Sequence, residues 1–250
     1  EEDQREGCVS SYPTRFPDCG PPASQDDVFF AVKTCEKFHT ERVPVVQRTW
    51  GKHAKHIEIY SEKEDTSIPT VYLGVNNTER GHCAKTFAIL RRALEQPLIS
   101  KMQWLVIADD DTLLSVRRML QLLACYDPRQ AVALGERYAY GATAGFGYDY
   151  LTGGSSMVFS ITAVRQMLDS GRCMCPTPDT PDDMTIGMCL KSLGIPVTHS
   201  PYFHQARPED YSEDMLSHQL PVSFHKHWMV DPYRVYDDWF ADADVAHDEL

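Results

Sequence analysis

Short apolar runs alternate with amphipathic segments along most of the chain. Buried strands are predicted at residues 27–34, 57–60, 70–73, 105–108, 131–134 and 157–159. Apolar residues recur at helical spacing over residues 39–50, 85–94, 113–126, 163–168 and 181–193, so these segments are predicted helices. The alternation of strands and helices predicts an α/β domain with a mostly parallel central sheet flanked by helices.

Three segments lack this pattern. Residues 1–26 hold Cys8, Cys19 and four prolines without periodicity, which indicates a linker or an irregular segment. Residues 138–150 are too rich in glycine and tyrosine for a regular helix and suit a mobile lid or an acceptor loop. Residues 241–250 form an acidic end. The predicted domain therefore covers residues 27–240.

The predicted strand at residues 105–108 ends in three carboxylates, Asp109, Asp110 and Asp111. Open α/β sheets bind their ligands at the carboxyl ends of their strands. Adjacent carboxylates repel, and Mg²⁺ or Mn²⁺ relieves that repulsion while leaving coordination positions for phosphate. A solvated turn that caps the next helix is the simpler alternative and would explain one aspartate easily. Three of them favour a metal and phosphate site.

Composition excludes some functions. The net charge of −12 over 250 residues argues against nucleic acid and anionic membrane surfaces as partners, since both attract basic patches. No run of about 18 apolar residues occurs, so no membrane span is expected. No signal peptide is visible either, so we expect a processed form or a fragment.

Several features point to the secretory pathway. Residues 247–250 read His-Asp-Glu-Leu, an endoplasmic-reticulum retention signal, for which an acidic tail is the alternative explanation. Asn76 begins an N-glycosylation sequon. The eight cysteines suit an oxidising lumen, where four disulfides would allow 105 connectivities. Cys173 and Cys175 lack a matching second pair, so a zinc site is not expected.

Other candidates are weaker. Asp182 and Asp183 follow a proline and would suit helix capping, or would supply a general base. His204 and His225 each follow a phenylalanine, and either would complete a metal shell. Basic side chains that would neutralise a diphosphate are Lys33, Arg42 and Arg137. The sequence has no Gly-x-Ser-x-Gly elbow and no dinucleotide-binding glycine loop after the first strand.

These residues occur in segments that resemble the inverting β-1,3-glycosyltransferases, the family that includes fringe and the core-1 galactosyltransferases. The resemblance covers about residues 27–250, and the matching segments are residues 27–39, 42–50, 81–87, 108–111, 134–137, 181–183 and 199–208. It implies a GT-A (Rossmann-like) fold, a UDP-sugar donor and Mn²⁺ or another divalent cation. Because relatives match only in their C-terminal half, it also implies a further N-terminal domain.

The resemblance also implies roles for particular residues. Asp111, with Asp109, would bind the metal, and Asp183 matches the catalytic base. Asp110 would face the sugar or ribose of the donor, and Arg42 lies near the nucleotide. The residues expected to contact the donor are thus Lys33, Thr34, Arg42, Asp109 and Asp110. In fringe the metal-binding histidine belongs to a Phe-His-x-His segment whose second histidine is Ala206 here. His225 matches a histidine of the core-1 enzymes, so it is preferred to His204 as the metal ligand.

Within the family, the sequence is most similar to members that transfer glucose from UDP-glucose to the 3-hydroxyl of O-linked fucose on thrombospondin type 1 repeats. The retention signal fits those members better than the Golgi-resident ones. The expected partners are therefore O-fucosylated thrombospondin type 1 repeat proteins. Two alternatives stay open: transfer of N-acetylglucosamine or galactose as in other members, and a catalytically silent lumenal binding module.

Overall fold

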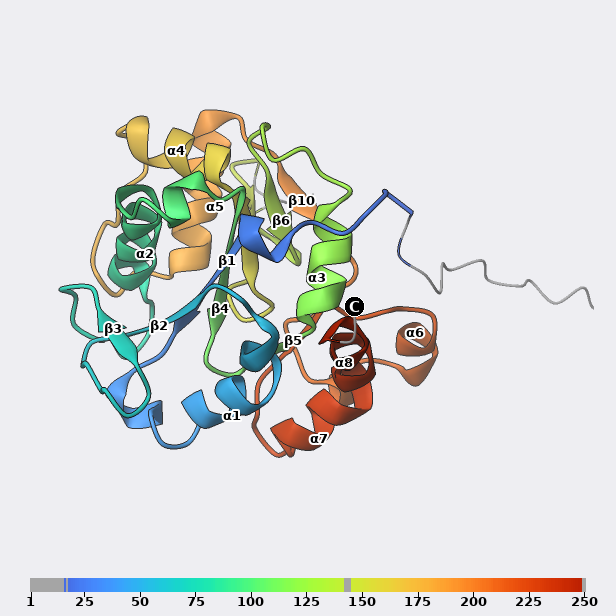
Figure 1. The fold of residues 1–250 in the computed structure, drawn as a ribbon. Helices are drawn as coiled ribbons and strands as arrows, with labels where there is room; N and C mark the ends of the chain where they lie inside the picture. Colours follow the sequence, from blue (N-terminus) through green and yellow to red (C-terminus); the bar gives the residue numbers. More distant parts are fainter. Residues whose placement is uncertain (1–15, 17, 142–144, 249–250) are drawn as a thin grey trace, which may run out of the picture.

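Seven strands form one mixed sheet at the centre of the molecule, in the order β10-β6-β9-β4-β1-β2-β3 (Figure 1). The computed structural model describes residue 16 and residues 18–141 and 145–248. The strands of this sheet are β1 (Val28–Lys33), β2 (Ile57–Ser61), β3 (Thr70–Tyr72), β4 (Trp104–Asp109), β6 (Ala133–Gly135), β9 (Met157–Ser160) and β10 (Val197–His199). Only β9 runs antiparallel to its neighbours in this described sheet. The predicted α/β class with a mostly parallel sheet is confirmed.

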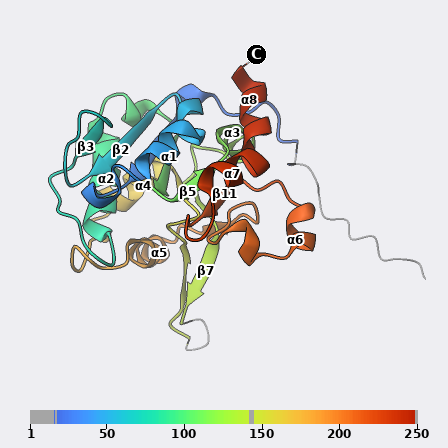
Figure 2. The ribbon, with the colours of Figure 1, turned by 90° about the horizontal axis from the view of Figure 1, so that it is seen from below.

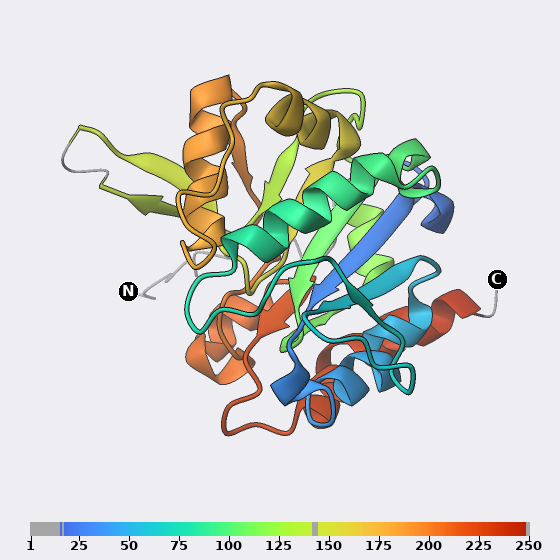
Figure 3. The same ribbon diagram turned by 90° about the vertical axis from the view of Figure 1, so that its left-hand side faces the viewer.

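Helices cover both faces of the sheet (Figures 1 and 3). The α-helices are α1 (Val43–Arg48), α2 (Cys83–Glu95), α3 (Val116–Leu123), α4 (Ile161–Asp169), α5 (Asp182–Leu193), α6 (Glu213–Ser217), α7 (Pro232–Tyr236) and α8 (Asp242–Asp248). Short 3-10 turns lie at Gln25–Asp27, Glu36–Phe38, Trp50–His53, Ile99–Lys101 and Pro208–Asp210, and a π turn at Asp237–Ala241.

The central strands β1 and β4 are buried on both faces, which explains their continuous apolar runs. Their alternating side chains enter two separate cores. Phe30 and Val106 pack with α1, α3 and α7 on one face. Phe29 and Leu105 pack with α2, α4 and α5 on the other. Two layers of helices therefore fix the position of the strand ends that carry Lys33 and Asp109.

The predicted helix at residues 113–126 is wrong at its start. Residues 112–114 form strand β5 (Thr112–Leu114), which pairs antiparallel with β11 (Ser223–His225). The helix begins only after Ser115, whose hydroxyl accepts a hydrogen bond from the Arg118 backbone NH. Leu113 and Leu114 fit helical spacing, but their pairing with a strand about 110 residues away overrides the local pattern.

Two paired strands form a hairpin in the region where the sequence analysis expected a lid or loop. Strand β7 (Arg137–Tyr140) pairs antiparallel with β8 (Tyr148–Leu151). The expectation of mobility falls partly on residues 142–144, which lie outside the described residues. Figure 2 shows β7 extending away from the body of the molecule.

Three disulfides join distant parts of the described chain: Cys19–Cys125, Cys83–Cys175 and Cys173–Cys189. Cys35 is a free thiol, and Cys8 lies outside the described residues. Six of the seven described cysteines are therefore paired, as expected for an oxidising compartment. Cys173 and Cys175 each have a disulfide partner, which agrees with the expectation that they bind no zinc.

The C-terminal segment packs against α3. The buried carboxylate of Asp244 accepts hydrogen bonds from the Ser115 hydroxyl at 2.7 Å and the Tyr236 hydroxyl at 2.8 Å. The packed part of the chain thus continues past residue 240. The retention sequence at residues 247–250 lies partly outside the described residues. Among the described helices, none combines the length and apolar character that crossing a membrane requires.

Candidate active site

The carboxyl ends of β1 and β4 lie side by side and carry the first charged residues of the site. Lys33 and Asp109 are partners in the parallel register of these strands. The Lys33 ammonium lies 3.0 Å from Asp109 Oδ1 and 2.6 Å from Asp182 Oδ2. Burial alone would lower the pKa of Lys33, but the charges of Asp109 and Asp182 raise it above its usual range. Lys33 is therefore a buried cation that links two carboxylates.

A tight turn follows β4 and orients the other two aspartates. The Thr112 hydroxyl accepts a hydrogen bond from the Asp109 backbone NH at 3.1 Å and donates one to the Gly154 carbonyl at 2.8 Å. The Trp50 indole NH donates to the Thr112 carbonyl at 2.9 Å. Together these bonds fix the turn against the 3-10 turn at Trp50–His53 and against Gly154.

Asp109, Asp111 and His225 come together as a group that can hold a metal ion. One ligand atom from each lies within 4.8 Å of the other two. His225 reaches this position because β11 pairs with β5, directly after the aspartates. A Cβ atom at Gly154 would collide with the imidazole of His225, so glycine makes room for the ring. Two carboxylates and one imidazole suit Mn²⁺ or a similar cation.

Asp111 and His225 contact each other directly. His225 Nε2 lies 3.1 Å from Asp111 Oδ1. Burial acts to lower the pKa of His225, but the hydrogen bond and charge of Asp111 raise it. Burial likewise acts to raise the pKa of Asp111, but His225 and Arg42 lower it to about 2. Asp111 is thus an ionised oxygen donor, the form that metal binding requires.

Asp110 is outside the candidate metal group and contacts Thr34 and Arg42 instead. It accepts hydrogen bonds from the Thr34 hydroxyl at 2.7 Å and from Arg42 at 2.9 Å. Arg42 also lies 2.9 Å from Asp111, and its guanidinium stacks 3.7 Å from the centre of the Phe38 ring. Burial raises the pKa of Asp110 to about 6. The structure therefore brings together all five residues that were expected to contact the donor.

A cavity of about 740 Å³ opens above these residues. The three aspartates, Arg42 and His225 line one side of it. Lys85 and residues 77–79 line the other side, and the Lys85 ammonium donates a hydrogen bond to the Thr34 carbonyl at 2.5 Å. A cavity of this size, lined by many charged and polar side chains, is large enough for a nucleotide-sized ligand.

Asp182 and Asp183 open helix α5 and differ in environment. Asp182 is buried and accepts hydrogen bonds from Lys33 and, at 2.5 Å, from the Thr86 hydroxyl. Burial raises the pKa of Asp183, and the neighbouring charge of Asp182 raises it further. The more distant charge of Asp109 acts in the same direction. Asp183 therefore lies on the same side of the molecule as the metal group, linked to it through Asp182 and Lys33.

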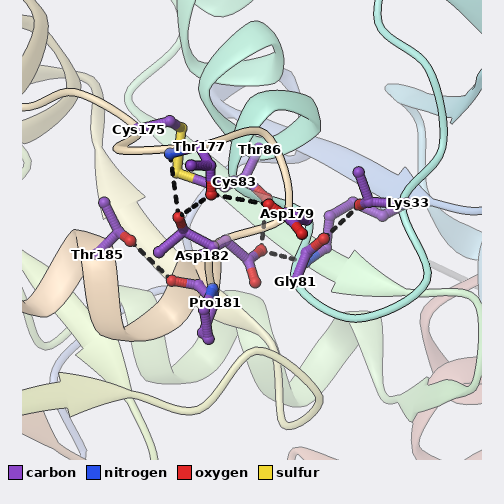
Figure 4. Close-up of a disulfide and its surroundings, with 12 residues drawn as sticks. Lys33, Gly81, Cys83, Thr86, Cys175, Thr177, Asp179, Pro181, Asp182 and Thr185 are labelled. Atoms are coloured by element: carbon purple, nitrogen blue, oxygen red, sulfur yellow. Dashed lines mark hydrogen bonds and ion pairs between the residues drawn. A yellow bond between two sulfur atoms is a disulfide. The ribbon is translucent and has the colours of Figure 1, made fainter.

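Residues 176–181 lead into α5, which carries Asp183 in its first turn, and pack against the start of α2 (Figure 4). The disulfide Cys83–Cys175 joins the two segments. The backbone NH groups of Gly81 and Cys83 donate to the carbonyls of Asp179 and Thr180 at 3.1 and 3.2 Å. A Cβ atom at Gly81 would collide with the backbone of Thr180, which explains why glycine is required there.

Two candidates from the sequence, His204 and Arg137, lie outside the group of Asp109, Asp111 and His225. His204 is buried, with Nδ1 3.2 Å from the Tyr202 carbonyl and Nε2 3.0 Å from Gln219 Oε1. It packs on Phe224 and is outside the metal group. Arg137 is half exposed on β7 and lies 3.7 Å from Asp149 across the hairpin.

The sequence analysis missed several residues of the site. Lys85 lines the cavity, and Gln205 contacts the His225 ring, with its carbonyl oxygen 3.1 Å from Nδ1. Thr86 contacts Asp182. Lys85 and Thr86 lie in a segment that carried the family resemblance, so that segment held a signal for them. For Gln205 the signal was its position directly after the candidate His204.

Comparison with known proteins shows the family of this chain. A family model described as Fringe-like matches residues 23–245. The chain belongs to the Fringe-like family.

Two curated relatives are named β-1,3-glucosyltransferase. The mouse protein is 54% identical over 243 residues, which is 97% of this chain and 49% of the relative. The human protein is 56% identical over 237 residues, 95% of this chain and 47% of the relative. The chain therefore spans about half the length of these relatives.

More distant relatives include bovine lunatic fringe, a β-1,3-N-acetylglucosaminyltransferase, which is 29% identical over 205 residues, 73% of this chain and 54% of the relative. Among solved structures, a glycosyltransferase involved in glycosylating the major capsid of PBCV-1 aligns with a TM-score of 0.49 and 12% identity. That alignment covers 85% of this chain and 98% of the other.

Proposed function

We propose that this chain carries the active site of an inverting β-1,3-glucosyltransferase. The donor is UDP-glucose, and the acceptor is the 3-hydroxyl of O-linked fucose on thrombospondin type 1 repeats. One observation carries the proposal: Lys33 bridges Asp109 of the metal group and Asp182, the neighbour of Asp183. A candidate metal site and a candidate base therefore share one edge of the sheet. The 54–56% identity to the two β-1,3-glucosyltransferases supports the choice of glucose.

The residues fit a divalent cation of the Mn²⁺ type. Asp109, Asp111 and His225 would hold it, and Gly154 leaves the space that His225 needs. When bound, such an ion supplies positive charge to the two phosphates of the leaving UDP. Arg42 lies 2.9 Å from Asp111 and lines the same cavity, so it adds a second positive charge beside the diphosphate.

Asp183 acts on the acceptor. Its raised pKa makes it a stronger base than an exposed aspartate. It takes the proton from the fucose 3-hydroxyl as that oxygen attacks the anomeric carbon of glucose. The attack comes from the face opposite the departing diphosphate, so the configuration inverts and the new linkage is β. Asp182 differs in role, because its bonds to Lys33 and Thr86 leave it as a structural anion.

The test offers UDP-glucose to a folded, O-fucosylated thrombospondin type 1 repeat in the presence of Mn²⁺ and follows hexose addition by mass spectrometry. We expect one added hexose per fucose and its loss when the metal is chelated. Parallel reactions with UDP-N-acetylglucosamine and UDP-galactose test the specificity of the lunatic fringe relatives and of other members. Preferred transfer from either of these donors would refute glucose as the transferred sugar. Absence of transfer and of metal-dependent UDP binding would leave the silent binding module as the better explanation.

We also propose that the protein works in the lumen of the endoplasmic reticulum. The sequence of residues 247–250 and the three disulfides support this location. Immunofluorescence of the natural protein with and without those four residues tests it. Retention that does not depend on them would refute their role.

A further inference from the structure

Four tyrosines share one face of the β7–β8 hairpin. Tyr138 pairs with Tyr150 and Tyr140 with Tyr148, so all four side chains point to the same side. The ring centres of these two pairs lie 6.2 and 5.7 Å apart, and those of Tyr148 and Tyr150 lie 6.4 Å apart. The hairpin therefore carries a continuous aromatic surface, here named the tyrosine face.

The tyrosine face adjoins the candidate base. Strand β8 packs on α5 so closely that a Cβ atom at Gly187 would collide with Tyr150. Gly187 lies one helical turn after Asp183, on the same side of α5. Burial raises the pKa of Tyr150, and the charge of Asp183 raises it further. The inner end of the face is thus next to the carboxylate that receives the acceptor proton.

The outer end of the face is exposed. Tyr140, in the outer pair, is 58% exposed, and Phe146, beyond β8 towards the tip, is 85% exposed. Tyr138, opposite Tyr150 in the inner pair, is still 45% exposed. The hairpin extends away from the body of the molecule (Figures 2 and 3). Its four residue pairs are separated by three steps of ~3.3 Å and so span about 10 Å, which is longer than one sugar ring. Exposed tyrosines of this kind are typical anchors of protein interfaces.

We propose that the tyrosine face docks the polypeptide of the glycosylated acceptor while its sugar reaches Asp183. This inference rests on the proposed function, which requires an acceptor hydroxyl at Asp183. The protein surface that continues outward from Asp183 would therefore contact the polypeptide to which the acceptor sugar is attached. Strand β8 also leads directly into the turn at Gly153, which lies beside Lys33 and Asp109. Docking on the hairpin is therefore coupled to the site by a short length of chain.

The experiment compares two acceptors with one variant, Tyr140→Ala. The first acceptor is a folded, O-fucosylated thrombospondin repeat, and the second is p-nitrophenyl α-fucoside, which lacks a polypeptide. We expect the KM for the repeat to rise about five- to tenfold, because an interface anchor is truncated. The kcat and the KM for the fucoside should not change. Tyr140→Phe should behave as the wild type, since it keeps the ring.

Tyr72→Ala is the matched control. Tyr72 is 43% exposed on β3, the edge strand at the other end of the sheet, so its loss should leave both KM values unchanged. An unchanged KM for the repeat in Tyr140→Ala would overturn the inference, and so would an equal rise for both acceptors.

A direct binding measurement distinguishes failure of this inference from failure of the proposed function. If the wild-type protein transfers no glucose, the proposed function fails, and calorimetry with the fucosylated repeat still tests the hairpin. The inference then expects Tyr140→Ala to weaken binding of the repeat about five- to tenfold. Equal affinity in the two proteins, or no measurable binding to either, would overturn it.

Discussion

The two sides of the site are held in place by different means. The side with the candidate metal ligands Asp109, Asp111 and His225, here called the metal-binding side, rests on the ends of two central strands and on ion pairs of Lys33, Arg42 and His225 with the aspartates. The Asp183 side follows an irregular loop that is tied to α2 by Cys83–Cys175 and by three backbone hydrogen bonds, from Gly81, Cys83 and Ala84.

This difference has a functional consequence. Ion pairs respond to a bound cation, because Asp111 contacts Arg42 and His225 and would also contact the ion. A loop that is tied covalently keeps its position whether or not the donor is bound. We therefore expect substitutions on the metal-binding side to change donor binding and substitutions on the Asp183 side to change turnover.

The largest effect is expected for Asp183→Asn. Removing the base should lower kcat by about 10²- to 10⁴-fold, the usual contribution of general-base catalysis. The affinity for UDP with Mn²⁺ should stay near that of the wild type. Transfer assays and isothermal calorimetry measure the two quantities.

Asp179→Asn serves as the control, since Asp179 is exposed in the same loop and its side chain bonds only locally to Thr177 among the described contacts. It should keep full turnover. Wild-type turnover in Asp183→Asn would show that another group accepts the proton.

The next largest effect is expected for Asp111→Asn. Loss of an ionised ligand should weaken Mn²⁺-dependent UDP binding about ten- to a hundredfold, the scale known for substitutions around metal sites. Titration of UDP at fixed Mn²⁺ checks this, with Asp149→Asn on the exposed hairpin as a carboxylate control. An affinity equal to that of the wild type would exclude Asp111 as a ligand.

The same difference explains which parts of the site could be predicted from the sequence. The metal-binding side follows from one local pattern, a buried strand that ends in Asp109, Asp110 and Asp111, so it was predicted from the residues alone. His225 was favoured over His204 only through family resemblance, because its position depends on the pairing of β11 with β5.

The Asp183 side depends on contacts that no local pattern encodes. Asp182 looks like an ordinary helix-capping residue in the sequence, yet Lys33, 149 residues earlier, makes it a buried ion pair. The pairing of Cys83 with Cys175 was one of many connectivities that the sequence allowed. Likewise, glycine and tyrosine content excluded a helix at residues 138–150 but did not predict that the strands would pair.

A smaller effect on transfer is expected for the double variant Cys83→Ser with Cys175→Ser. Loss of this tie should lower the stability by about 2–5 kcal/mol. Well below the unfolding temperature it should also lower kcat several-fold, because the loop before Asp183 loses its covalent link to α2. The KM for UDP-glucose should not change.

Cys19→Ser with Cys125→Ser is the matched control. This disulfide joins the segment before β1 to the end of α3 and is remote from Asp183 in the fold. It should lower stability by a comparable amount and leave kcat unchanged. Equal kcat losses in the two double variants would mean that Cys83–Cys175 has no specific role in placing the base.

The smallest effect concerns acid stability and the buried pair of Asp182 and Lys33. Burial acts to raise the pKa of Asp182, but the charge of Lys33 and the hydrogen bonds from Lys33 and Thr86 lower it from 3.8 to about 2. A lowered folded-state pKa gives stability that is present above pH 3.8 and is lost as the pH falls to about 2. That contribution is about 2 kcal/mol.

Asp182→Asn removes this titration, so the unfolding free energy of the variant should fall less steeply between pH 4 and pH 2 than that of the wild type. Denaturant unfolding at several pH values measures the difference between the two curves. Parallel curves would mean that the ion pair is not what keeps Asp182 ionised, and that the link between the two sides of the site is steric.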